Sequence, residues 1–163
     1  MILIVLLGGY SPAQGQQNNE VTITASATVI GDQGINIVII SDMGILEARQ
    51  LQEGNELYIN PVFDAEAGIM RAEGIPGETI RVSFLEEEEV GRREGEGSLS
   101  FVYEVSGYPG DNQRESELLE EIERELRFNE EGEFYFFVGG SIDMSDAQPG
   151  NYDGEFTLEI EYM

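Results

Sequence analysis

Apolar and polar residues alternate along much of the chain, and the longest alternating stretch lies at its C-terminus. Tyr152, Phe156, Leu158, Ile160 and Tyr162 share one face of that stretch, and most residues on the other face are glutamates. Alternation with a period of two indicates a half-buried β-strand. Because one face is apolar and the other acidic, we expect this strand to close an antiparallel sandwich, with its acidic face in water.

The same pattern predicts strands in most of the remaining chain. A clean first strand alternates apolar residues with threonine and serine, and its apolar positions are Val21, Ile23, Ala25, Ala27 and Val29. Further strands are expected at residues 35–40, 57–61, 69–73, 79–85, 99–105 and 134–138. Residues 35–40 are apolar enough to predict a central strand, residues 74–77 predict a hairpin or tight corner, and residues 86–97 predict an exposed loop. The total is about seven to nine antiparallel strands in a mainly β sandwich.

Residues 112–128 depart from the β pattern. Asn112 and Glu115 have capping-box spacing, and acidic and basic residues recur four positions apart. Four apolar residues would form one helical stripe: Leu118, Leu119, Ile122 and Leu126. We therefore predict one short amphipathic helix, inserted into the sandwich to cap an open end of its core. A partner-binding helix is the alternative, although an apolar stripe usually faces its own domain.

The first 15 residues predict a secretory signal peptide. An apolar run too short to span a bilayer is followed by small residues, with a cleavage site near Gly15. No basic residue precedes the run, so the signal peptide would be truncated or atypical; a buried N-terminal strand is the alternative. Residues 16–163 then form a single domain. We expect a secreted protein, extracellular or at the cell surface, without a stable membrane span.

Charge narrows the range of partners. The chain has 33 acidic and 8 basic residues and a formal net charge of −25, and all eight basic residues are arginines. Such a surface repels nucleic acid and anionic membranes. Heavy use of glutamate without lysine suggests adaptation to high salt, which screens the self-repulsion; an ordinary acidic secreted protein is the alternative.

The residue inventory also limits the chemistry. Cysteine, histidine and lysine are absent, which removes thiolate, imidazole and Schiff-base catalysis and the usual zinc ligands, so we predict no enzyme. Carboxylate and amide oxygens are suitable ligands for Ca²⁺. The candidate calcium ligands are Asp143, Asp146, Asn151 and Asp153. The alternative is that they are turn-forming residues. No other cofactor is expected.

The end of the chain resembles a known kind of domain. Residues 139–144, Gly-Gly-Ser-Ile-Asp-Met, and residues 148–162, Gln-Pro-Gly-Asn-Tyr-Asp-Gly-Glu-Phe-Thr-Leu-Glu-Ile-Glu-Tyr, are similar to the closing motif of a family of secreted bacterial domains of unknown function. Residues 21–29, 42–46 and 74–82 resemble the family's earlier strand and turn motifs in the same order. The resemblance implies an Ig-like or fimbrial-like β-sandwich with a surface or pilus-type role. The predicted helix and the acidity depart from it.

These observations lead to two functional hypotheses. The first is a structural or adhesive subunit that self-associates, or joins related surface subunits, into filaments by β-strand addition, with the strand from Val21 to Val29 as donor. That strand would otherwise pair within its own domain. The second is a monomeric extracellular module that binds Ca²⁺ or another ligand, such as a glycan stacked on Tyr108, Tyr135 or Tyr152.

Overall fold

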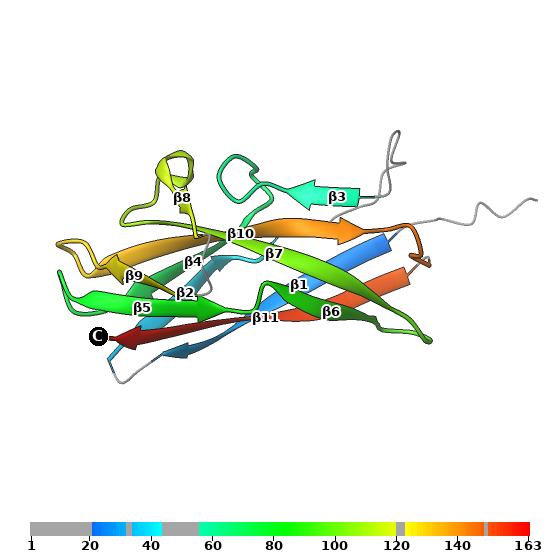
Figure 1. Cartoon of the computed structure of the whole chain (residues 1–163), viewed down its shortest axis with the longest axis horizontal. Helices are drawn as coiled ribbons and strands as arrows, with labels where there is room; N and C mark the ends of the chain where they lie inside the picture. Colours follow the sequence, from blue (N-terminus) through cyan, green and yellow to red (C-terminus); the bar gives the residue numbers. More distant parts are fainter. Residues whose placement is uncertain (1–20, 32–33, 44–55, 120–122, 149) are drawn as a thin grey trace, which may run out of the picture.

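The structure is a computed structural model, which describes residues 21–31, 34–43, 56–119, 123–148 and 150–163. The predicted signal peptide, residues 1–15, lies outside the described residues. The predicted mainly β fold is confirmed, with eleven strands and one short 3₁₀ turn in the described part (Figure 1). The strands are β1 (Val21–Gly31), β2 (Asn36–Ser41), β3 (Glu56–Ile59), β4 (Gly68–Glu73), β5 (Thr79–Phe84), β6 (Glu87–Arg92), β7 (Ser98–Tyr108), β8 (Glu117–Leu118), β9 (Glu123–Arg127), β10 (Glu133–Asp143) and β11 (Gly150–Tyr162).

The strands form two layers that are joined along one side. Hydrogen bonds connect them in the order β2-β4-β10-β7-β6-β11-β5-β9, while β1 pairs with β11, β3 with β10 and β8 with β7. β6 and β11 share only two residue pairs, so the sheet turns over at this point. One layer contains β1, β11, β5 and β9, and the other contains β2, β4, β10, β7 and β6 (Figure 1). All pairs are antiparallel except β1 with β11, and the architecture is that of an open sandwich.

The core fills the space between the layers. The predicted terminal strand is confirmed as β11: Tyr152, Phe156, Leu158 and Ile160 are all buried, with at most 2% of their surface exposed. The centre of the Phe156 ring lies 4.8 Å from that of Tyr103 in the opposite layer. Each such buried side chain contributes roughly 1.5–3 kcal/mol through removal of apolar surface from water. β11 therefore closes the sandwich as its alternation predicts.

Two glycines in the closing motif allow β10 to pass between close neighbours. A Cβ at Gly139 would lie 2.3 Å from the carbonyl oxygen of Ile59 in β3, and one at Gly140 would lie 2.1 Å from that of Val102 in β7. Gly140 also has a φ of 142°, which L side chains rarely adopt. The Gly-Gly pair is thus required by backbone packing in the second layer.

The predicted amphipathic helix over residues 112–128 is wrong. The described residues form a 3₁₀ turn at Gln113–Glu115, then β8 and β9, and the Asn112 side chain caps nothing. β9 pairs with β5, and Phe128 just beyond it is buried. Helical ion pairs are worth only about 0.2–0.5 kcal/mol each, so a ladder of cross-strand hydrogen bonds and a buried phenylalanine outweigh them.

Two smaller expectations are also corrected, and a third is decided between its two alternatives. Residues 86–97 are not wholly a loop, because β6 occupies 87–92 and pairs with β7. Of the hairpin and the tight corner predicted for residues 74–77, the structure has the corner, since β4 and β5 do not pair with each other. β2 lies at the end of the strand order, where we expected a central strand. Its apolar composition therefore calls for another explanation.

Candidate functional site

The first two strands lie at the open side of the sandwich, one in each layer. β1 pairs with β11, and β2 pairs with β4; in the described part of the chain neither has a neighbour on its other side. Gly31 and Gly34 bracket the connection between them. We call the open side between these two edges the seam.

β1 is paired along its whole length with the last strand. The register runs in parallel from Val21 opposite Gly150 to Gly31 opposite Ile160 and includes all eleven residues of β1 (Figure 1). The predicted assembly positions Val21, Ile23 and Ala25 lie opposite Gly150, Tyr152 and Gly154, and Ala27 and Val29 lie opposite Phe156 and Leu158. A strand that contributes its backbone to a single neighbour can be exchanged without rearrangement of the rest of the sheet.

The two edges at the seam carry no charge, and the edge at the other end of the strand order carries many. β1 and β2 contain no charged residue, although a quarter of the chain is charged. At the far edge of the first layer, four of the five residues of β9 are charged. Four of the six residues of β6 are also charged, although β6 is not an edge, because it lies between β7 and β11. Proteins commonly protect sheet edges with charges, because an uncharged edge pairs readily with another chain. Of the edge strands β1, β2 and β9, β9 alone has this protection.

β2 is apolar and partly exposed. Ile39 is 47% exposed and Ile40 is 50% exposed. A β-bulge between Ile39 and Ser41 interrupts the pairing of β2 with β4. At the start of the strand, the side-chain amide of Asn36 donates a hydrogen bond of 3.0 Å to the Glu73 carboxylate on β4. This bond, together with the nearby Arg71 guanidinium, lowers the pKa of Glu73. β2 is therefore fixed on one side and open on the other.

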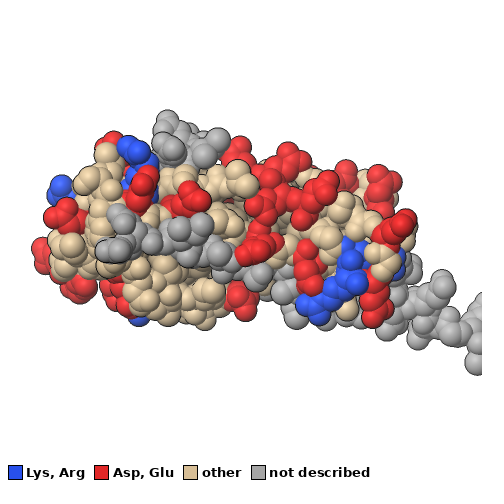
Figure 2. Space-filling view, turned by 90° about the horizontal axis from the view of Figure 1, so that it is seen from below, with Lys and Arg blue, Asp and Glu red and all other residues tan. Residues whose placement is uncertain are grey.

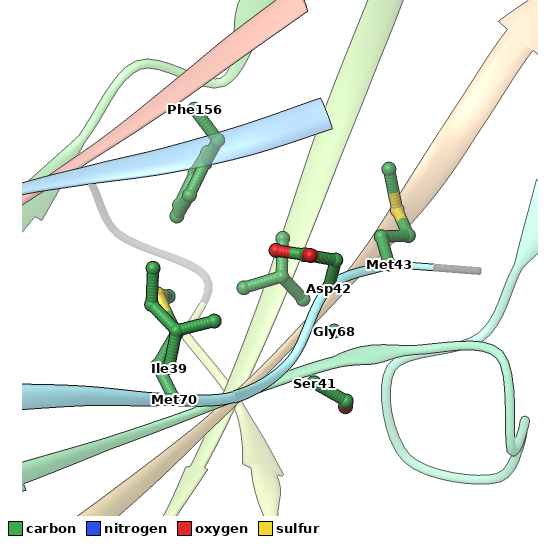
Figure 3. Close-up of a pocket in the computed structure, with 8 residues that line it drawn as sticks. Ile39, Ser41, Asp42, Met43, Gly68, Met70 and Phe156 are labelled. Atoms are coloured by element: carbon green, nitrogen blue, oxygen red, sulfur yellow. The ribbon is translucent and has the colours of Figure 1, made fainter. Parts of the chain in front are cut away.

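A small apolar cavity lies where β2 ends, with a volume of about 20 Å³. Phe156 lines it from the first layer, and Ile39, Met43 and Met70 line it from the second (Figure 3). A cavity of this size holds no more than about one water molecule. The side chains at the seam therefore leave almost no empty space in the core. What is open there, in the described part of the chain, is the backbone edge of each strand.

Carboxylates far outnumber basic groups in the chain, 33 to 8. On the face seen from below in Figure 1, aspartate and glutamate side chains are spread along the molecule, whereas arginines are gathered in small areas (Figure 2). Several arginines are engaged by acids: Arg71 pairs with Glu73 and with Glu133 at 3.4 Å, and Arg93 pairs with Asp153. A second copy therefore meets repulsion over most of the surface and least repulsion at the seam.

The structure gives separate partners to two of the predicted calcium ligands. The Asp143 carboxylate accepts hydrogen bonds from the backbone amide and the hydroxyl of Ser145, at 2.8 and 2.5 Å, which lower its pKa. Asp153 pairs with Arg93, and Asp146 and Asn151 are exposed. Among the described residues, no three acidic side chains are grouped as a metal site requires.

The three tyrosines considered for stacking on sugars have different surroundings. Tyr152 is buried, and its hydroxyl bonds to the backbone of Gln148. Tyr135 is also buried and lies opposite Tyr108 on the neighbouring strand. The half-buried Tyr108 donates a 2.5 Å hydrogen bond to Glu115. They do not form an exposed aromatic platform.

Tyr103 is the most strongly shifted buried acid–base group in the described part of the chain. Burial, together with the charge of Glu88, raises its pKa to about 12. Its hydroxyl has no hydrogen-bond partner among the described residues. A phenol with so high a pKa stays protonated at neutral pH and supplies neither a base nor a nucleophile.

Sequence reasoning identified β1 but missed the edge position of β2. The signal was present in the charge pattern, because residues 21–41 contain one charged residue, Asp32, in a highly acidic chain. No described helix is long and apolar enough to cross a membrane. Compared with models of known protein families, the chain matches none, and no curated protein is significantly similar to it.

Proposed function

We propose that this chain is an extracellular structural or adhesive subunit that assembles with further copies by β-strand addition, with β1 as the donated strand. The observation that carries the proposal is the distribution of charge over the sheet edges. In a chain with a net charge of −25, the edge strands β1 and β2 are both uncharged, whereas the edge strand β9 has four charged residues out of five. Strand addition uses main-chain hydrogen bonds at such an unprotected edge.

Exchange of β1 between copies preserves its contacts. If β1 leaves its own β11 and pairs with β11 of a neighbour, the same eleven-residue register forms between chains. Only the connection around Gly31 and Gly34 has to change conformation, and glycine allows a wide range of backbone angles. An exchange in which each copy donates to the next produces an open chain of subunits unless the rotation closes a ring. The resemblance of the closing motif to secreted domains with a fimbrial-like sandwich agrees with this role.

The test compares the full chain with a variant that lacks residues 16–29, in about 1 M NaCl, where the screening length falls to about 3 Å. We expect electron micrographs of the full chain to contain filaments, and the deletion variant to form none. A synthetic peptide of residues 21–31 serves as the control in both samples. The peptide should take the place of the missing β1 and so restore folding to the deletion variant. In excess, it should compete with β1 of neighbouring copies and shorten the filaments of the full chain.

Two results would overturn the proposal. One is a deletion variant that folds without the peptide and still polymerises. The other is a full chain that remains a uniform population of single particles at every salt concentration tested. The second result would favour the alternative of a monomeric ligand-binding module.

A further inference from the structure

The edge of β2 is not explained by donation of β1. If β1 is exchanged, the same edge of β11 is filled again, and the outer edge of β2 stays as it was. This edge consists of Asn-Ile-Val-Ile-Ile-Ser, in which four of six residues are β-branched aliphatic and none is charged. Such a segment has high β propensity and low charge, which favours pairing with another strand. The half-exposed Ile39 and Ile40 add an apolar contribution.

We propose that the outer edge of β2 binds β2 of a second copy, in antiparallel orientation about a two-fold axis. The charge of the molecule points to a second copy. A basic partner would be matched by an acidic edge, whereas the approach of another chain of charge −25 is tolerated best where neither surface carries charge. A two-fold contact uses the same patch on both copies and closes on itself.

The register follows from the limits of β2. A pairing centred on Val38 sets Ile37 opposite Ile39 of the second copy, and Asn36 opposite Ile40 of the second copy, so every pair lies within β2. A pairing centred on Ile37 would need residues before Asn36, outside the strand. In an antiparallel pair, opposed residues share a face of the sheet. Ile37 packs on the core, and Ile39 lines the seam cavity. The proposed register therefore places Ile37 of one copy beside Ile39 of the second copy on the same face of the sheet, where the two side chains cover each other.

The contact is of modest size. The β-bulge at Ile40, which is opposite Asn36 of the second copy, limits regular pairing on each strand to Ile37–Ile39. Two such short edges form few hydrogen bonds, each worth about 0.5–1.5 kcal/mol net. We therefore expect a weak, reversible association that strengthens as NaCl screens the charge of the two copies.

The test places one charge on the edge and the same charge elsewhere. Ile40→Glu puts a carboxylate at the proposed contact, and Ile75→Glu, in the corner after β4, is the matched control, because the two isoleucines are 50% and 55% exposed. Association of the full chain is measured by analytical ultracentrifugation in about 1 M NaCl. We expect Ile40→Glu to weaken association at least about tenfold relative to Ile75→Glu. Equal association of the two variants would overturn the proposal.

A second variant tests the register. The chain has no cysteine, so Val38→Cys introduces a single thiol that meets its own copy at the two-fold axis. Opposed residues in antiparallel strands have Cα atoms about 4.5–5.5 Å apart, within the usual range for a disulfide. Under mild oxidation we expect Val38→Cys to form covalent dimers faster than an Ile75→Cys control. Equal rates would contradict the register.

This inference stands apart from the donation of β1, and the experiments separate the two. Filaments that vanish when residues 16–29 are removed, with cross-linking of Val38→Cys no faster than the control, would support β1 exchange and overturn the β2 contact. Rapid cross-linking of Val38→Cys in a chain that forms no filaments would do the reverse.

Discussion

Replacement of Phe156 by alanine is expected to destabilise the sandwich strongly. Phe156 lies on β11 beside the seam and is 2% exposed. Its ring centre is 4.8 Å from that of Tyr103 in the other layer and 6.0 Å from that of Phe84 on β5. The side chain also forms one wall of the small seam cavity. The substitution therefore removes contacts between the layers and enlarges an existing void.

The magnitude follows from these contacts. Replacement of a buried phenylalanine by alanine costs about 3–5 kcal/mol, because the apolar surface is lost and the cavity relaxes only in part. Native domains are stable by about 5–15 kcal/mol, so the variant should remain folded but close to its limit. The matched control is Phe63→Ala: Phe63 is 65% exposed, and its loss should change the free energy of unfolding by no more than about 0.5 kcal/mol.

The assay is equilibrium unfolding in urea, at a salt concentration where the wild type is most stable, followed by circular dichroism. We expect the urea concentration at the midpoint of unfolding to fall. The slope of the free energy of unfolding against urea concentration should not change, since the surface exposed on unfolding is almost unchanged. A loss below about 1 kcal/mol would refute the reasoning. Phe156 would then not be packed between the layers, and β11 would not close the core at the seam.

Three further predictions concern the surface and the core. The free energy of unfolding should rise between low and molar NaCl, because salt screens the charge of −25; no rise would contradict adaptation to salt. A further rise in the free energy of unfolding when millimolar CaCl₂ is added at constant NaCl would support the predicted calcium site. If CaCl₂ adds no stability, that site is removed. Gly140→Ala should destabilise by several kcal/mol, because its Cβ would meet a β7 carbonyl oxygen, whereas Gly91→Ala, with open space around its Cβ, should not; similar unfolding midpoints would contradict the close strand packing. Tyr103→Phe should raise stability at neutral pH by about 1 kcal/mol, because it removes a buried hydroxyl without a partner. With the folded-state pKa raised to about 12, the wild type should lose stability as the pH rises from about 10 towards 12, and the variant should lose less in a pH series of urea midpoints; identical pH profiles would contradict the shift.

The alternating strands were predictable from sequence because one of their faces is buried. β11 shows this most clearly, since its apolar residues enter the core and its glutamates remain in water. β7 and β5 follow the same rule. A period of two is a local property of the chain, so it is visible without knowledge of the neighbouring strands.

Pairing and edge position were less accessible, because they depend on residues distant in sequence. β9 has good helical spacing, but its partner β5 lies 40 to 48 residues earlier, from Ser83 opposite Glu123 to Thr79 opposite Arg127, and decides its conformation. β2 has the composition of a central strand and lies at an edge. Its true position becomes interpretable only when the lack of charge in β1 and β2 is compared with the charged strands β6 and β9.

The most direct test of strand exchange is whether β1 of one copy lies on β11 of another. Ser26 and Glu155 are opposed in the β1–β11 register, and adjacent strands are about 4.7–4.9 Å apart, so cysteines at these positions can form a disulfide. A Ser26→Cys chain and a Glu155→Cys chain are unfolded, mixed and refolded together in molar NaCl, then oxidised. Thr28→Cys, which lies opposite Thr157, replaces Ser26→Cys in the out-of-register control.

If the account is right, the Ser26→Cys and Glu155→Cys chains become linked to each other, and the control mixture does so far less. Exchange of β1 is contradicted if the mixture stays unlinked while a single chain that carries both substitutions forms its disulfide internally. In that case β1 belongs to its own sandwich alone, and the uncharged seam does not assemble subunits by exchange of this strand.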